Sequence, residues 1–257
     1  MKGVENMNHL TIQHLPELPF DMEESINQLR VNLGFCGDQI KTVVITSSIP
    51  NEGKSFIAVY LWKMLAELGS RVLLIDCDLR KSEMRTKYGI SSAEKITGIA
   101  HYLAGKVELQ DAVYETNIPN GYMIPLSAPV ANPSILLENP RFSEMIETCA
   151  GKFDYVLIDT PPLESVADGL RIAAHADGTV LVVRSGQTSR KLVADAVDKL
   201  KRTGTPVLGI ALNRVEMQQK GGYYYKRYYY NGYYGRGYGR TNSQKRLAAS
   251  AENKTGR

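Results

Sequence analysis

The 257-residue chain has 43% hydrophobic residues, enough to bury one substantial core, so we expect one domain with tails. Its net charge of +4 is unevenly distributed along the chain. Residues 217–257 carry nine Lys/Arg and one acid (+8), whereas the remaining residues carry 22 Lys/Arg and 26 Asp/Glu (−4). Three cysteines far apart in the sequence exclude a paired-cysteine metal site or a disulfide framework and favour reduced thiols in a cytosolic protein.

The N-terminal region is expected to be an arm followed by a helix. Residues 1–20 are polar and contain no continuous apolar stretch of the kind found in signal peptides, which predicts a flexible N-terminal arm. Asp21 is a candidate cap for a helix that runs to about Leu33. Farther on, the longest apolar segment, residues 56–68, is too short and too charged to cross a membrane, so we expect a cytoplasmic protein.

After this helix, short Val/Ile/Leu-rich segments alternate with helical patterns. We expect strands at residues 42–46, 71–75, 122–126, 155–158, 179–183 and 207–212, and helices at 55–68, 141–149, 167–175 and 188–203. Continuous apolar strands separated by helices are typical of a parallel sheet covered on both faces. The sequence therefore predicts an α/β fold with a doubly wound, mostly parallel sheet in a domain spanning residues 21–215.

A phosphate-binding loop is predicted between the first strand and its helix, in the sequence Ser47-Ser48-Ile49-Pro50-Asn51-Glu52-Gly53-Lys54-Ser55. Backbone N–H groups of such a loop bind phosphate at a helix N-terminus, the lysine reaches the β- and γ-phosphates, and the hydroxyl binds Mg²⁺. Ser48 replaces the first glycine of the usual pattern, so the Walker motif is deviant, and a plain turn is the alternative. The expected nucleotide contacts are Pro50, Asn51, Glu52, Gly53, Lys54, Ser55 and Phe56.

Carboxylates end two of the expected strands. Asp76 and Asp78 follow one strand at alternate positions, and Asp159 follows another. The carboxyl ends of strands in a doubly wound sheet face the ligand crevice, so we expect all three to converge on Lys54 and, with Ser55, on a metal ion. Single acids at strand ends often cap the next helix, but three beside a lysine-serine loop favour a catalytic site.

Near the end of the chain, nine tyrosines occur within sixteen residues, with Gly, Lys, Arg and Asn filling the gaps. They are Tyr223, Tyr224, Tyr225, Tyr228, Tyr229, Tyr230, Tyr233, Tyr234 and Tyr238. A basic tail of this composition, residues 216–257, is expected to be disordered. It could be a linker, or it could stack on single-stranded nucleic acid, but no other nucleic-acid motif is present, and we expect no nucleic-acid partner.

The loop, the Asp76/Asp78 segment and Asp159-Thr160-Pro161-Pro162 resemble the bacterial tyrosine kinase family, the cytoplasmic kinases of capsule and exopolysaccharide assembly. Further segments share the resemblance, which spans residues 20–238 and includes the tyrosines: Asn132-Pro133-Ser134, Asp177-Gly178, Gly186-Gln187-Thr188 and Leu212-Asn213-Arg214-Val215. The family loop has glycine where this chain has Asn51, a residue that tolerates left-handed backbone.

The resemblance implies an ATP-dependent kinase with ATP and Mg²⁺ at Lys54 and Ser55, and Asn213 near the adenine. The nine tyrosines would be its autophosphorylation sites, with transfer between subunits of a homo-oligomer. A tyrosine hydroxyl has a pKa near 10 and must shed its proton, and we favour Asp76 as the base, although Asp78 and Asp159 stay open for that role. Glu24 and Arg30 match the family's subunit-contact motif, whose middle arginine is Asn27 here.

The resemblance also implies a membrane-anchored activator or polysaccharide co-polymerase subunit, which would recruit the chain to the inner face of the plasma membrane, and a cognate phosphotyrosine phosphatase. A partition-type ATPase switch is the main alternative. That class places a second lysine where this chain has Ile49, and it lacks the tyrosine cluster. A non-catalytic interaction module with an adhesive tyrosine-rich tail is the third possibility.

Overall fold

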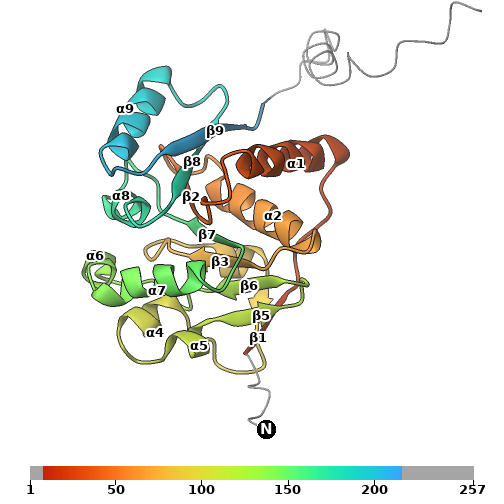
Figure 1. Ribbon diagram of the computed structural model, residues 1–257, viewed down its shortest axis with the longest axis vertical. Coiled ribbons are helices and arrows are strands. Elements are labelled where there is room, and N and C mark those ends of the chain that lie inside the picture. Colours follow the sequence, from red (N-terminus) through yellow and green to blue (C-terminus); the bar gives the residue numbers. More distant parts are fainter. Residues whose placement is uncertain (1–7, 216–257) are drawn as a thin grey trace, which may run out of the picture. The chain divides into compact units, whose positions relative to one another are not determined.

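The computed structural model describes residues 8–215, which fold around a twisted sheet with helices on both faces (Figure 1). In this described part, the sheet has nine strands in the order β4-β1-β5-β6-β3-β7-β2-β8-β9. The strands are β1 (His9–Ile12), β2 (Thr42–Ser47), β3 (Val72–Asp76), β4 (Ile90–Ser91), β5 (Tyr114–Thr116), β6 (Gly121–Ile124), β7 (Tyr155–Asp159), β8 (Gly178–Arg184) and β9 (Val207–Asn213).

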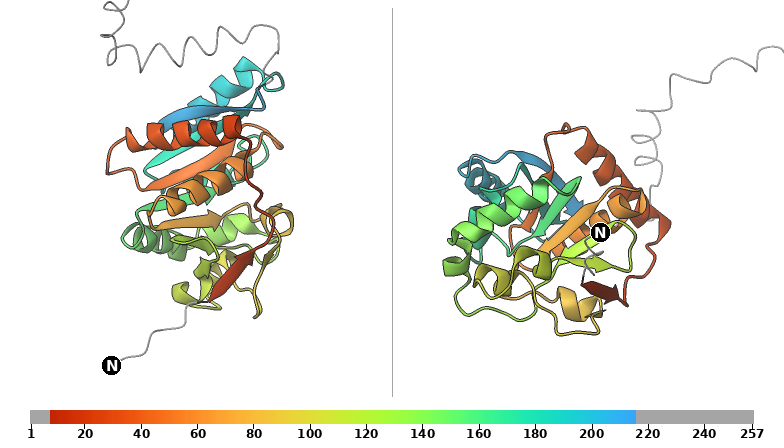
Figure 2. Two further views of the ribbon diagram at one scale, coloured as in Figure 1. Left: turned by 90° about the vertical axis from the view of Figure 1, so that its right-hand side faces the viewer. Right: turned by 60° about the horizontal axis from the view of Figure 1, so that its bottom comes forward.

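The helices form a layer on each face of the sheet, with α1 and α2 on one face and α7, α8 and α9 on the other (Figures 1 and 2). They are α1 (Phe20–Gly34), α2 (Lys54–Glu67), α3 (Met84–Lys87), α4 (Ile99–Leu103), α5 (Leu109–Ala112), α6 (Pro133–Leu137), α7 (Pro140–Ala150), α8 (Asp168–Ala173) and α9 (Arg190–Lys201). Of these described helices, none is long and apolar enough to span a membrane.

Alternation along the central strands explains why these segments form a buried parallel sheet. Val43 and Ile45 of β2 pack in the core under α1 and α2, whereas Val44 packs in the opposite core under α7. Strands from β6 through β3, β7, β2 and β8 to β9 are all paired in parallel. The predicted doubly wound, mostly parallel α/β fold is confirmed. The loop after β2 lies at the topological switch point of the sheet, because later strands are added on both sides of β2.

The N-terminal region departs from the sequence prediction. Residues 9–12, expected within a flexible arm, form β1, which pairs in parallel with β5 and antiparallel with β4. Leu10 and Ile12 are buried there, and a four-residue strand gains this stability from tertiary partners that local patterns do not reveal. The prediction that Asp21 caps the next helix is also wrong, because α1 begins at Phe20 after Pro19 and has no side-chain cap.

Helix α2 is positioned rigidly against the sheet, which fixes the loop at its N-terminus. Gly69 has φ +99°, and its N–H bonds to the Ala66 carbonyl while that of Ser70 bonds to the Leu65 carbonyl, which ends the helix in a left-handed turn. The indole of Trp62 is fully buried and donates to the Val72 carbonyl at 3.1 Å. Helix and strand β3 are therefore joined by both packing and a hydrogen bond.

Candidate active site

The loop between β2 and α2 has the backbone shape of a phosphate-binding loop. Asn51 has φ 66° and Gly53 has φ 97°, so two positions of the loop are left-handed. A Cβ at position 53 would lie 2.0 Å from the Asn213 amide nitrogen, which leaves room for glycine only. Asn51 adopts the left-handed conformation that its side chain was expected to tolerate.

The side chain of Glu52 braces the loop from inside and does not face the phosphate site. Its carboxylate is 1% exposed and accepts the Ile49 N–H at 2.8 Å, the Arg184 N–H at 3.0 Å and the hydroxyl of Thr188. The Asn213 amide donates to the Glu52 carbonyl at 2.9 Å. The ends of β8 and β9 thus hold the loop, which preorganises its N–H groups.

Lys54 is the first residue of α2 and its ammonium lies among the carboxylates that were expected to converge there. Its Nζ is 3.0 Å from Asp78 Oδ2 and 3.6 Å from Asp159 Oδ1, and it donates to Ser55 Oγ at 3.3 Å. Asp76 and Asp159 are direct partners in the register of β3 and β7, so their side chains leave neighbouring strands side by side. The structure therefore brings Lys54, Ser55 and all three aspartates together.

Burial and mutual charge perturb this cluster strongly. Burial, followed by the neighbouring charge of Asp159, raises the pKa of Asp76 to about 7. Burial likewise raises the pKa of Asp159, against the opposing effect of Lys54. Burial lowers the pKa of Lys54, but the carboxylates more than offset this and its pKa is raised overall. Clustered, shifted groups of this kind are typical of a site that handles charge.

The cluster fits a divalent cation that is also bound by substrate phosphates. Asp76 Oδ1 and both carboxylate oxygens of Asp159 are buried without a hydrogen-bond partner among the described residues. Within residues 8–215, however, no group of three or more carboxylate, imidazole or thiol side chains forms a ready metal cage. Mg²⁺ is usually held by one or two carboxylates, water and phosphate oxygens, so the donors present suit Mg²⁺ with a nucleotide.

Two supports of the site were missed in the sequence. The Ser82 hydroxyl donates to Asp76 Oδ2 at 2.5 Å. Buried Asp168 accepts Arg80 Nε at 2.7 Å and the Ser134 hydroxyl at 2.8 Å, which ties the loop after β3 to α6 and α8. Arg80 and Ser134 lie in or beside segments that carry the family resemblance. Asp168, which both residues contact, is distant in sequence, and its neighbouring residues do not indicate this role.

The remaining expected residues lie as follows. Pro50 is exposed at the tip of the loop, and Phe56 stacks on Tyr60 with ring centroids 4.6 Å apart, so its side chain packs beside the core. Glu24 is exposed on α1, and Arg30 donates two hydrogen bonds to Asn27 of the same helix, at 3.0 and 2.9 Å. The nine tail tyrosines lie outside the described residues.

The nucleotide-binding fold is also found in comparisons with known proteins. Residues 40–204 match the family model described as AAA domain. The septum site-determining protein MinD complexed with Mg-ADP, from Pyrococcus horikoshii, is a structural neighbour with a TM-score of 0.61 and 26% identity, covering 70% of this chain and 72% of that one. This likeness supports nucleotide binding by this fold.

Two further comparisons concern kinases. The tyrosine-protein kinase CpsD of Streptococcus agalactiae is 39% identical over 193 residues, or 75% of this chain and 83% of that protein. The kinase domain of Escherichia coli tyrosine kinase ETK has a TM-score of 0.72 and 27% identity, with 82% of this chain and 86% of that chain covered. With its phosphate-binding loop and carboxylate cluster, the chain belongs to the bacterial tyrosine-protein kinase family.

Proposed function

We propose that this protein transfers the γ-phosphoryl group of ATP to tyrosines of its own C-terminal cluster, residues 223–238. One observation carries the proposal: the Lys54 ammonium lies at the N-terminus of α2 between carboxylates from the ends of β3 and β7. A phosphate-binding loop, a cation and buried carboxylates at one point are the parts that phosphoryl transfer requires.

The proposed roles follow from the geometry. The loop N–H groups and Lys54 bind the phosphates and stabilise charge on the transferred group. Ser55, Asp78 and Asp159 would hold Mg²⁺, which supplies further charge neutralisation when ATP is bound. A tyrosine oxygen attacks the γ-phosphorus, its proton passes to a carboxylate, and ADP leaves. Asp76 is the favoured base because its pKa of about 7 matches the operating pH of a proton acceptor.

The acceptor tyrosines are proposed to come from another subunit. The last described residue, Val215, follows β9, and the tyrosines begin eight residues later. For a random-coil chain, eight residues (to Tyr223) and twenty-three residues (to Tyr238) correspond to about 16 Å and about 27 Å, enough to reach the cleft of a neighbouring subunit. Transfer between subunits is proposed on the family resemblance. Exposed Glu24 and the neighbouring Arg30 on α1 are the proposed subunit contacts, with Arg30 held along the helix by Asn27.

The family resemblance extends the proposal to the cellular role. On this proposal, the kinase regulates capsular or exopolysaccharide synthesis and acts in the cytoplasm, recruited to the inner face of the plasma membrane. The recruiting partner would be a membrane-anchored activator or co-polymerase subunit, and a phosphotyrosine phosphatase would reverse the reaction. Asn213, which contacts the loop at Glu52, is the proposed neighbour of the adenine.

A labelling experiment tests the proposal against a nucleotide-driven switch. Wild type, Lys54→Met and Lys63→Met are incubated with γ-labelled ATP and Mg²⁺, and both phosphotyrosine and released phosphate are measured. Lys63 is the matched control because it lies on the same helix, away from the carboxylate cluster, and forms an ion pair with Glu67. We expect phosphotyrosine in wild type and Lys63→Met but not in Lys54→Met. Phosphate release without phosphotyrosine in wild type would favour the switch and overturn the kinase proposal.

A further inference from the structure

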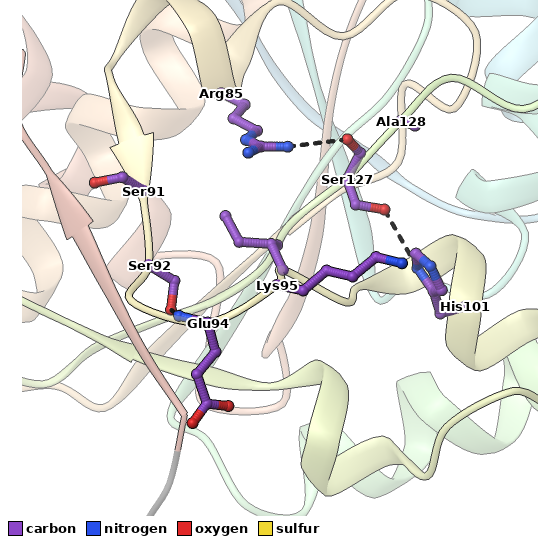
Figure 3. Close-up of a pocket in the computed structure, with 9 residues that line it drawn as sticks. Arg85, Ser91, Ser92, Glu94, Lys95, His101, Ser127 and Ala128 are labelled. Atoms are coloured by element: carbon purple, nitrogen blue, oxygen red, sulfur yellow. Dashed lines mark hydrogen bonds between the residues drawn. The ribbon is translucent and has the colours of Figure 1, made fainter.

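A polar groove lies beside the carboxylate cluster, at the C-terminal ends of the strands. Its outer part is a cavity of about 440 Å³ whose walls include Arg85, Lys95, His101 and Ser127 (Figure 3). A second cavity of about 410 Å³ shares Arg85 and Ser127 and extends to Ser82. Ser82 lines this second cavity and donates to buried Asp76, so the groove ends one hydrogen bond away from the proposed catalytic base.

The lining of the outer cavity is cationic and rich in hydroxyl groups. Figure 3 shows the ends of Arg85 and Lys95 within the cavity, whereas the carboxylate of Glu94 points away from both. Arg85 donates to the Ser127 carbonyl at 3.1 Å, and the Ser127 hydroxyl lies 3.2 Å from His101 Nδ1. Among the described residues, no ion pair neutralises Arg85 or Lys95.

The surrounding segment is a basic island on an acidic body. Residues 80–106 contain six Lys/Arg and two Asp/Glu, a net charge of +4. The other residues of 1–216 contain sixteen Lys/Arg and twenty-four Asp/Glu, a net charge of −8. Burial, followed by the charges of Lys106 and Lys95, lowers the pKa of His101, as expected where cations lack a facing anion. Exposed Arg85 and Lys95 therefore provide a site for an incoming anion.

The position of the groove relative to the loop identifies the direction from which an acceptor can enter. Asn213 ends β9 on one side of β2, and Asp76 ends β3 on the other side. The groove continues in this second direction, across the loop after β6 to β4. A nucleotide that extends from the loop toward Asn213 leaves the groove open to the peptide that supplies the tyrosine.

We propose that this groove binds a phosphotyrosine of the tyrosine-rich segment and thereby holds a neighbouring tyrosine at the catalytic carboxylates. This inference rests on the proposed kinase function. The segment contains two Tyr-Tyr-Tyr runs, residues 223–225 and 228–230, in which an acceptor always has a tyrosine close by. In extended chain, residues two apart are separated by about 7 Å, so a phosphorylated and an acceptor tyrosine can occupy neighbouring parts of one groove.

Charge makes the site selective for tails that are already modified. The unmodified segment is basic and is repelled by Arg85 and Lys95, whereas each phosphate brings about −1.5 to −2 charges and strong acceptor oxygens. The first phosphate on a tail would then promote the next transfer to the same tail. Phosphates should accumulate on a few tails to high occupancy before the other tails are modified.

Direct binding tests the groove independently of catalysis. Fluorescent peptides of residues 221–240, unmodified or phosphorylated at Tyr224, are titrated with phosphatase-treated wild-type protein without ATP, and anisotropy is recorded. We expect the phosphopeptide to bind at least about tenfold more tightly at moderate salt. An Arg85→Gln/Lys95→Gln double variant should lose this preference, and so should Lys95→Gln alone in large part. Lys152→Gln, an exposed lysine outside the groove, should retain it.

Several outcomes would overturn the inference. These are equal binding of both peptides, equal loss in the Lys152→Gln control, or equally tight binding of a Tyr224→Glu peptide, which would show a response to charge alone. Unchanged thermal unfolding of the variants establishes that they are folded. A second arm measures phosphate transfer to each peptide: absence of transfer to both by wild type contradicts the proposed kinase function, whereas the binding result decides the groove.

Discussion

Glu52 provides the sharpest test of how the phosphate-binding loop is held. Its buried carboxylate accepts three hydrogen bonds: the one from Ile49 lies within the loop, and those from Arg184 and Thr188 join the loop to the end of β8 and the turn after it. Hydrogen bonds to a charged group contribute about 1.5–3 kcal/mol each, and water entering the site would replace part of this. We therefore expect Glu52→Ala to lower the free energy of unfolding by about 3–5 kcal/mol, as for other broken buried charge networks.

A milder variant keeps the test usable if Glu52→Ala does not fold. In Glu52→Gln one oxygen remains for the Arg184 and Thr188 donors, but the new amide faces the Ile49 N–H, so one bond is lost and about 1–3 kcal/mol with it. Urea unfolding at constant m-value measures both changes, and fluorescent-nucleotide titration should show weaker binding. Glu67→Gln, which loses only an exposed pair with Lys63, is the control. Glu52→Gln within about 0.5 kcal/mol of wild type would refute the brace.

Three further changes test the site. In metal-free buffer, Asp76→Asn should raise the free energy of unfolding by up to about 4 kcal/mol near pH 8 and by little below pH 4. The reason is that the pKa of Asp76 is about 7 in the folded protein and 3.8 in the unfolded chain, so ionisation at high pH destabilises the folded state of the wild type. Urea unfolding that shows no pH-dependent gain would contradict this. Gly53→Ala should weaken nucleotide binding at least about tenfold, whereas Gly69→Ala, equally left-handed but open, should spare it; equal titrations would exclude the predicted clash. Asp168→Asn, which removes the anchor of Arg80, should cost about 1–3 kcal/mol in urea unfolding, and a cost below about 0.5 would show the anchor to be unimportant.

Local chemistry made the centre of the fold predictable from sequence. Neighbouring residues specify the strand before the loop, the glycine at position 53 and the helix that starts at Lys54. Asp76 and Asp159 can be recognised from the sequence because each ends an apolar strand. Parallel pairing then brings those ends together, so the cluster follows from the fold class.

Long-range contacts set the limit of this prediction. Strand β1 exists because β5 and β4 flank it, and nothing in residues 9–12 alone requires a strand. Glu52 was expected to contact nucleotide, but its side chain is turned toward Arg184 and Thr188, which are more than 130 residues away in sequence. The hydrogen bond from Ser82 to Asp76 likewise depends on how the chain turns after β3, which the local sequence pattern does not predict.

Site-resolved mass spectrometry of the C-terminal segment tests the central claim most directly. Wild type and Lys54→Met are incubated with ATP and Mg²⁺, digested and mapped for phosphate. The account predicts phosphate on tyrosines of residues 223–238 in wild type and an unmodified segment in Lys54→Met, with Lys63→Met matching wild type. An unmodified segment in active, nucleotide-bound wild type, or equal phosphate in Lys54→Met, would contradict it.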